Sequence, residues 1–231
     1  MGLREWVRSS TQAGSRRAAM WDGLGRRLLQ AHRPEWALPC YRKALLLDSG
    51  NVRIWRRRAA AAVRCGLLEE AAACYRALCR LQPNSVRDHY NLAGIYDAVG
   101  APRAGIEICR RALELQPQEA FLHRQMGRLL LRAGSVPEAL RSLQRAAELG
   151  PTHYDTQYYV GLALRRAGRM TEAREALRHA LSLRPNDPKL YYALGLCCEP
   201  APGGSDSARL LLGGLAAEQL AAGLEPATRI G

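Results

Sequence analysis

The side chains that most often carry catalysis or bind metals are present in this chain, but not at the spacings those chemistries require. The five histidines and seven cysteines form no HExxH motif and no CxxC pair, so no zinc site is predicted. The sequence also contains no P-loop and no nucleophile elbow. An odd number of cysteines does not suit a disulfide framework and indicates reduced thiols. We therefore expect a protein that is not an enzyme, with no catalytic residues, no metal and no cofactor.

Arginine is the side chain whose chemistry stands out. The chain of 231 residues carries 34 basic and 21 acidic residues, and all but two of the basic ones, Lys43 and Lys189, are arginines. Guanidinium groups bind carboxylates and phosphates through paired hydrogen bonds. The net charge of +13 is therefore consistent with nucleic acid, anionic lipid or an acidic peptide as the partner. A GC-rich genome is the alternative explanation for the same composition.

An internal repeat defines the elements that must position these arginines. Prolines recur 34 residues apart at Pro83, Pro117, Pro151 and Pro185, and glycines do so at Gly66, Gly100, Gly134 and Gly168. This period is typical of stacked helical hairpins, in which the glycine ends the first helix and the proline follows the second. Placing each proline at position 32 defines five repeats: 18–51, 52–85, 86–119, 120–153 and 154–187. The chain has only 6% aromatic residues and no apolar run long enough for a membrane span, which also favours close-packed helices.

The residues that recur within this period resemble those of the tetratricopeptide repeat family. Small residues occupy position 8 (Gly25, Ala59, Ala93, Gly127, Gly161) and position 20 (Ala37, Ala71, Gly105, Ala139, Ala173). The family's tryptophan at position 4 is present as Trp21 and Trp55 and is replaced by His89, His123, Gln157 and Tyr191. We expect His89 and His123 to be packing residues rather than metal ligands. His32 and Ser49 replace the usual glycine and proline of the first repeat, and Arg58 occupies an otherwise apolar position 7. The resemblance covers about residues 18–199 and implies an all-α, right-handed superhelical solenoid.

The two ends of the chain depart from the repeat. Residues 1–17 are basic and are predicted to form either a lead-in helix or a targeting segment. Residues 188–222 are predicted to form a degenerate sixth repeat, whose second helix begins at Ser205 or Asp206 and caps the stack. We expect the tail, 223–231, to be frayed.

The family resemblance implies that positions 2, 5, 9, 12 and 13 of the first helices line a concave groove that binds peptides. In this sequence those positions combine arginines with aromatic residues. The predicted partner-binding residues are Arg53, Arg56, Arg87, Tyr90, Phe121, Arg124, Arg128, Arg132, Tyr158, Arg165, Arg166 and Tyr192. We therefore expect an adaptor or scaffold that binds an acidic peptide or helix of another protein. The expected location is the cytoplasm, or the mitochondrion if residues 1–17 are a transit peptide.

Three alternatives remain open at this point. The same arginines could pair with acidic residues of the array itself and form only a solvated surface. Arginines interleaved with aromatic residues also suit single-stranded nucleic acid. The chain could instead assemble with further copies of itself through Leu210, Leu211, Leu212 and Leu215. A carboxylate clamp for chaperone C-termini is not expected, because only Arg87 matches its residue types.

Overall fold

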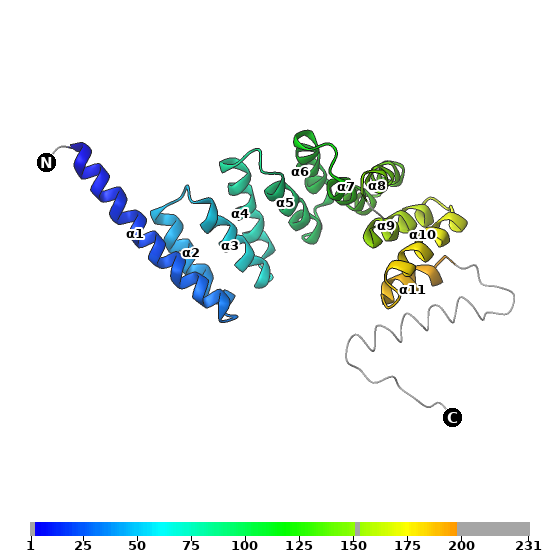
Figure 1. Cartoon of the computed structure of the whole chain (residues 1–231), viewed down its shortest axis with the longest axis horizontal. Coiled ribbons are helices and arrows are strands. Elements are labelled where there is room, and N and C mark those ends of the chain that lie inside the picture. Colours follow the sequence, from blue (N-terminus) through cyan, green and yellow to red (C-terminus); the bar gives the residue numbers. More distant parts are fainter. Residues whose placement is uncertain (1–2, 151–152, 198–231) are drawn as a thin grey trace, which may run out of the picture. The chain divides into compact units, whose positions relative to one another are not determined.

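The computed structural model describes residues 3–150 and 153–197, which form eleven α-helices and no strand. The helices are α1 (Leu3–Gln30), α2 (Pro34–Leu47), α3 (Val52–Arg64), α4 (Leu68–Leu81), α5 (Val86–Ala98), α6 (Pro102–Leu115), α7 (Ala120–Ala133), α8 (Val136–Leu149), α9 (Tyr154–Arg166), α10 (Met170–Leu183) and α11 (Pro188–Gly195) (Figure 1). They divide between two compact units, an N-terminal unit (Met1–Leu115) and a C-terminal unit (Gln116–Gly231). None of the helices in the described residues has the length and apolar character needed to cross a membrane.

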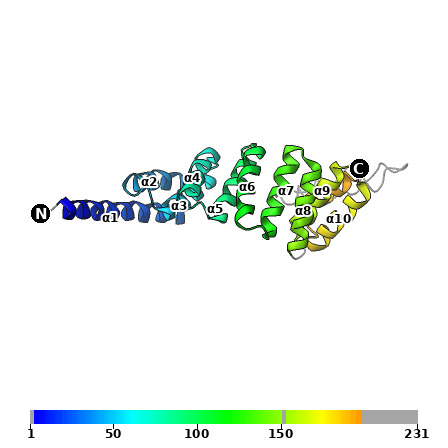
Figure 2. The same ribbon diagram turned by 90° about the horizontal axis from the view of Figure 1, so that it is seen from above.

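The N-terminal unit consists of three helical hairpins, α1/α2, α3/α4 and α5/α6. Each hairpin stacks on the next through contacts of α2 with α3 and of α4 with α5. Figure 2 shows the first helices α1, α3 and α5 on one side of this unit and the second helices α2, α4 and α6 on the other. The core is rich in alanine and leucine and includes Ala37, Tyr41, Ala61, Ala71 and Leu92, all at most 1% exposed. Small residues let the helix axes approach closely, so the hairpins stabilise one another by burying apolar surface.

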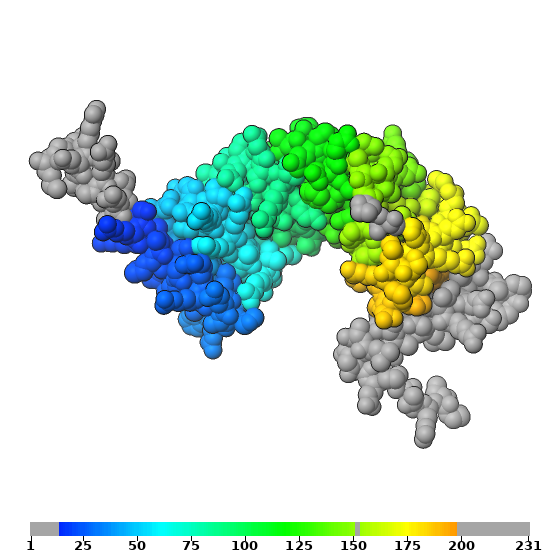
Figure 3. Space-filling model, viewed as in Figure 1, coloured from blue at the N-terminus to red at the C-terminus, as the bar shows by residue number. Residues whose placement is uncertain are grey.

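The C-terminal unit repeats this arrangement with the hairpins α7/α8 and α9/α10, followed by α11. The second helix of each hairpin contacts the next first helix, α8 with α9 and α10 with α11. The core around α11 contains Ala173, Leu177, Leu190 and Leu194, and side chains fill the space between neighbouring ribbons (Figure 3). The predicted capping helix, its four leucines and the C-terminal tail lie outside the described residues.

The turn inside each hairpin depends on a residue with left-handed backbone geometry. Gly66, Gly100, Gly134 and Gly168 have φ angles between 72° and 87°, as expected for glycines that end the first helices. In the first hairpin His32 takes the same role with φ 57°, the one positive φ of a non-glycine residue in the described part of the chain. The amide N–H of the next residue, Arg33, donates to the carbonyl oxygen of Leu28 over 2.9 Å, which closes the helix end. The first repeat therefore makes the same turn without the glycine that favours it.

The two helices of a hairpin touch at positions 8 and 24. A Cβ atom placed on Gly127 would lie 2.4 Å from Cγ of Leu143, and one on Gly161 would lie 2.6 Å from Cγ of Leu177. These distances are shorter than any real carbon–carbon contact, so a side chain at position 8 is excluded wherever leucine occupies position 24. The third repeat instead combines Ala93 with Cys109, a smaller residue at position 24.

The first helix of the first hairpin is twice as long as most of the others. α1 has 28 residues and begins at Leu3, so residues 3–17 are helical and continuous with the first repeat. Whether this segment is a lead-in helix or a targeting segment stays a prediction, as do the exact repeat boundaries.

Candidate protein-interaction site

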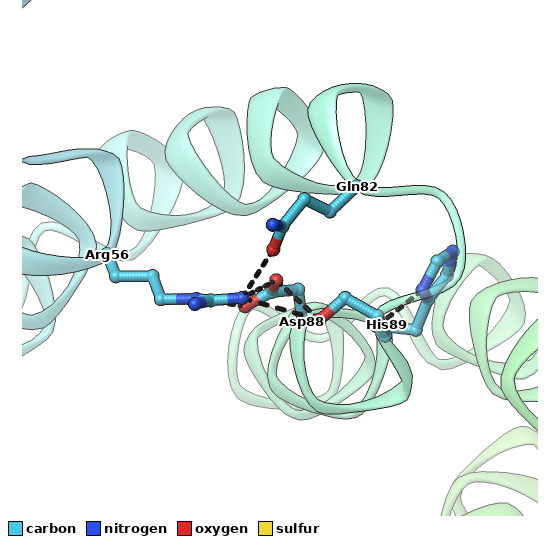
Figure 4. A network of polar contacts seen from close by, with 5 residues as sticks. Arg56, Gln82, Asp88 and His89 are labelled. Carbon is cyan, nitrogen blue, oxygen red and sulfur yellow. Dashed lines mark hydrogen bonds and ion pairs between the residues drawn. The ribbon is translucent and has the colours of Figure 1, made fainter. Parts of the chain in front are cut away.

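The predicted groove residue Arg56, on α3, binds an acidic residue of the next hairpin. Its Nε and Nη2 atoms donate to the two carboxylate oxygens of Asp88 on α5, over 3.1 and 2.7 Å. Nη2 also donates to Oε1 of Gln82 over 2.7 Å, and the hydroxyl of Ser85 donates to Asp88 over 2.6 Å. Figure 4 shows this network bridging two successive hairpins. Arg56 is therefore engaged within the protein, where it bridges the hairpins α3/α4 and α5/α6.

Burial and ion pairing shift the pKa of Asp88 in opposite directions. Asp88 is fully buried, whereas the side chain of Arg56 is 37% exposed. Burial alone would raise the pKa of Asp88, but hydrogen bonds from Arg56 and Ser85 and the nearby guanidinium groups outweigh it and lower that pKa. The hydrogen bond to Asp88 raises the pKa of Arg56 in turn. The pair links the two hairpins, and removing either partner would leave the other with an unpaired charge.

Other arginines of the first helices also serve the fold. Arg57 on α3 donates to the carboxylate of Asp22 on α1, with Arg26 3.8 Å from the same carboxylate. Arg64 donates to the main-chain oxygen of Leu29 over 3.2 Å. The same contact recurs 102 residues later, where the predicted groove residue Arg166 donates to the oxygen of Leu131. In both cases a position-13 arginine caps the carbonyl end of the preceding first helix, where a positive charge is favourable.

The remaining predicted residues of the N-terminal unit are Arg53, Arg87 and Tyr90. Arg53 and Arg87 are exposed, and Tyr90 is half-buried on α5. Arg53 lines a polar cavity of about 250 Å³ between α1 and α3, together with Asp22, Arg26 and Arg57. On the first-helix side of this unit, two of the arginines of α3, Arg56 and Arg57, are thus neutralised by largely buried acids, Asp88 and Asp22.

The C-terminal unit carries the other eight predicted residues on α7, α9 and α11. These are Phe121, Arg124, Arg128 and Arg132 on α7, Tyr158, Arg165 and Arg166 on α9, and Tyr192 on α11. The arginines at 124, 128 and 132 follow one another at four-residue intervals, which places them along one stripe of the helix. Tyr158 and Arg165 are seven residues apart and likewise share one side of α9. Tyr192 is 48% exposed.

Among the described residues, two of these arginines have neither an acidic partner nor, unlike Arg166, a main-chain acceptor. Neither Arg124 nor Arg165 forms an ion pair, and Nε of Arg165 is buried without a hydrogen-bond acceptor. On α7, Gln125 is 4% exposed, and its amide nitrogen Nε2 is likewise buried without a hydrogen-bond acceptor. Next to Arg165, burial raises the pKa of Tyr158, so its phenol is a neutral hydroxyl donor at pH 7. The first-helix face of the C-terminal unit, meaning the side chains of α7, α9 and α11 that are at least partly exposed, therefore includes two guanidinium groups, those of Arg124 and Arg165, that no acid of the described residues neutralises.

The comparisons with known proteins agree with this architecture. A family model described as tetratricopeptide repeat matches residues 23–86 and 124–188, and a second with the same description matches residues 89–119. The chain belongs to the tetratricopeptide repeat family. The all-α tetratricopeptide solenoid predicted from the repeat is thereby confirmed. Such solenoids are scaffolds for protein–protein interaction.

Several solved tetratricopeptide structures are similar to this chain in fold. MamA from Desulfovibrio magneticus RS-1 shares 15% identity, with a TM-score of 0.67 over 73% of this chain and 96% of that chain. YrrB, described as having an unusual peptide-binding site, shares 24% identity, with a TM-score of 0.63 over 75% of this chain and 89% of that one. Cut9, in the APC/C hetero-tetramer Cut9–Hcn1, shares 20% identity, with a TM-score of 0.69 over 87% of this chain and 40% of that one. No curated protein sequence matches the chain.

The residues at tetratricopeptide position 4 have a role that the sequence indicated only in part. Trp55, His123 and Tyr191 each hydrogen-bond to the main-chain oxygen six residues earlier, that of Ser49, Pro117 and Pro185, over 2.8 to 2.9 Å. Each acceptor is position 32 of the preceding repeat, so three different side chains bind the same carbonyl group. His89 instead pairs with the oxygen of Ser85 over 2.9 Å. The shared feature is an N–H or O–H group on a flat ring, so these residues bind the preceding repeat through a hydrogen bond as well as through packing.

Arg58 at position 7 is also explained by its neighbours. It donates from Nε and Nη2 to Oε1 of Glu70 and lies over the ring of Trp55, 5.8 Å from the ring centroid. Its aliphatic stem can cover apolar surface while the guanidinium group remains paired. In the described residues, no three His, Cys, Asp or Glu side chains come together to hold a metal ion.

Proposed function

We propose that this tetratricopeptide protein is a non-enzymatic adaptor that binds an acidic peptide or helix of another protein on the first-helix face of its C-terminal unit. The observation that carries the proposal is that Arg124 and Arg165 lack acidic partners among the described residues, whereas Arg56 and Arg57 are paired. The peptide-binding site named for YrrB gives independent support to this use of the fold.

The chemistry of this face suits carboxylates combined with apolar side chains. Arg124 and Arg165 would bind carboxylates through their guanidinium groups, whose paired, charge-assisted hydrogen bonds make such contacts strong. Phe121, Tyr158 and Tyr192 would contact apolar side chains, because aromatic groups contribute much of the energy of protein interfaces. Arg128, Arg132 and Arg166 would add positive potential around these anchors. The proposed location is the cytoplasm, with the mitochondrion as the alternative.

A peptide array tests this proposal directly. Labelled full-length protein is applied to synthetic twelve-residue peptides that vary in Asp, Glu and Lys content, and the affinity of the best binder is measured by fluorescence anisotropy. We expect acidic peptides to be selected, and Arg124→Glu with Arg165→Glu to weaken binding by about tenfold or more. Arg141→Glu with Arg178→Glu is the matched control, because both arginines are exposed on second helices and the change in net charge is identical.

Three results would contradict the proposal. Equal weakening by the control pair would show that only overall charge matters. Selection of basic peptides would exclude the acidic partner. Tighter binding of an oligothymidylate than of any peptide, with a steep dependence on salt, would favour the nucleic-acid alternative.

A further inference from the structure

The N-terminal unit has a second cationic surface, on the side opposite its first helices. A cleft of about 480 Å³ lies between the second helices α4 and α6, and α5 forms its floor. Its volume falls within the range typical of ligand pockets, about 300–1,000 Å³. All of its lining residues belong to the N-terminal unit, so the cleft is complete within that unit.

The rim of this cleft is basic and its arginines are not engaged by the protein. Arg76 and Arg80 lie on the α4 wall, and Arg111 lies on the α6 wall opposite them. All three are exposed, and none has a hydrogen bond or ion pair with the described residues. Glu114 is the only acidic residue of the lining. This contrasts with the first helices of the same unit, where Arg56, Arg57 and Arg64 are already bound.

Apart from the buried His89, the inner surface of the cleft, formed by α5 and by the inner side of α6, is mostly apolar. Leu92 is 1% exposed, Tyr96 and Ile108 are half-buried, and Leu115 is 39% exposed at the mouth. Burial raises the pKa of Cys79 in the wall to about 11, so its thiol carries no charge at pH 7. A ring of unpaired guanidinium groups around an apolar floor favours an occupant with carboxylates at its edges and one apolar side chain at its centre.

We infer that this cleft, between the second helices α4 and α6, is a second docking site for an acidic peptide segment that inserts an apolar side chain. Arg76, Arg80 and Arg111 bind its carboxylates, and Leu92, Tyr96 and Ile108 receive the apolar side chain. The inference goes beyond the proposed function, because it concerns the other unit and the other side of the hairpins. A partner could thus occupy one unit through first helices and the other through second helices.

The probe for this site is a peptide with one leucine flanked by three glutamates on each side, and its lysine analogue serves as the negative probe. The full chain contains five isoleucines, of which Ile108 lines the cleft and Ile54 lies buried on α3. Methyl NMR of isoleucine-labelled protein therefore reports on the cleft and on the first helices separately. We expect the acidic probe to shift Ile108 saturably and to leave Ile54 unchanged, and the affinity to fall with added salt.

The decisive variants reverse charge inside and outside the cleft. Arg76→Glu with Arg80→Glu should weaken binding of the acidic probe by about tenfold or more. Arg111→Glu alone should also weaken binding, because Arg111 lies on the opposite wall of the cleft. Arg42→Glu with Arg103→Glu is the matched control, since both residues are exposed on second helices outside the cleft. An unchanged Ile54 signal verifies that each variant is folded.

The outcomes separate this inference from the proposed function. If the acidic probe did not shift the Ile108 methyl signal, the inference that the cleft binds such a peptide would be wrong. It would also be wrong if the control pair weakened binding of the probe as much as the cleft variants do. The variant Arg124→Glu with Arg165→Glu should retain the Ile108 response, because its substitutions lie in the other unit. Loss of that response in this variant would also contradict a separate site.

Discussion

Replacing Gly127 by alanine should destabilise the C-terminal unit, although alanine is the better helix former. The new Cβ would lie 2.4 Å from Cγ of Leu143 and 3.2 Å from the main-chain oxygen of Ala139, where contacts of about 3.5–4.0 Å are optimal. Leu143 is fully buried and cannot retreat without displacing its neighbours. Overpacking costs about 1–3 kcal/mol, and so short a contact belongs at the upper end of that range. The higher helix propensity of alanine offsets about 1 kcal/mol of this cost, so the free energy of unfolding should fall by about 2 kcal/mol.

A second substitution should relieve this clash. The third repeat combines Ala93 at position 8 with Cys109 at position 24, and Cys109 is fully buried. Leu143→Cys alone should cost about 2–3 kcal/mol, because it leaves a cavity beside Gly127. With Gly127→Ala the cavity is partly filled, so the double variant should be about 2 kcal/mol more stable than the sum of the single effects predicts.

Urea unfolding followed by far-UV circular dichroism measures all four proteins of this cycle. Gly161→Ala is a second test, since a Cβ there would lie 2.6 Å from Cγ of Leu177. Additivity within about 0.5 kcal/mol would refute the packing argument, as would a Gly127→Ala protein at least as stable as the wild type.

Two further predictions concern the N-terminal unit. Asp88→Asn should lower the free energy of unfolding by about 1–3 kcal/mol at pH 7, because Arg56 loses its charged partner. The pKa of folded Asp88 lies below its ordinary value of 3.8, so the wild type should keep this advantage above that pH and lose it as the pH falls through the folded pKa. Urea unfolding of both proteins between neutral and acid pH measures the difference, and a constant gap would contradict the ionic origin. His32→Gly should stabilise the chain by about 0.5–1 kcal/mol, because glycine adopts the φ of 57° without steric cost. A lower urea midpoint would instead mean that the contact of His32 with Arg64, 3.2 Å from Nδ1 to Nη2, contributes more than the turn strain costs.

The fold could be predicted from the sequence because its determinants are local and repeat. A glycine every 34 residues marks a left-handed turn, and small residues at positions 8 and 20 mark where two helices touch. The departure at His32 was visible as well, since a missing glycine in a regular series indicates that another residue must adopt its geometry.

The candidate site could be predicted only in part. Position numbers identified the arginines of the first helices, but not that Arg56 is bound by Asp88 and Arg166 by the oxygen of Leu131. One signal was available, because Asp88 occupies a position where Ile54, Leu122 and Leu190 are apolar and buried. An acidic residue at a buried position needs a cationic partner. The cleft between α4 and α6 had no such signal, since its walls come from different repeats.

The amino-acid sequence by itself determined that this chain forms helical hairpins of the tetratricopeptide type, where each hairpin turns, and how closely its two helices approach. These properties follow from backbone geometry and side-chain size within one period of 34 residues. Only the tertiary structure decided which arginines are used internally and which remain available to a partner. A guanidinium group finds its acceptor within about 3 Å, whereas the residues that meet in this way are 32 to 35 positions apart along the chain.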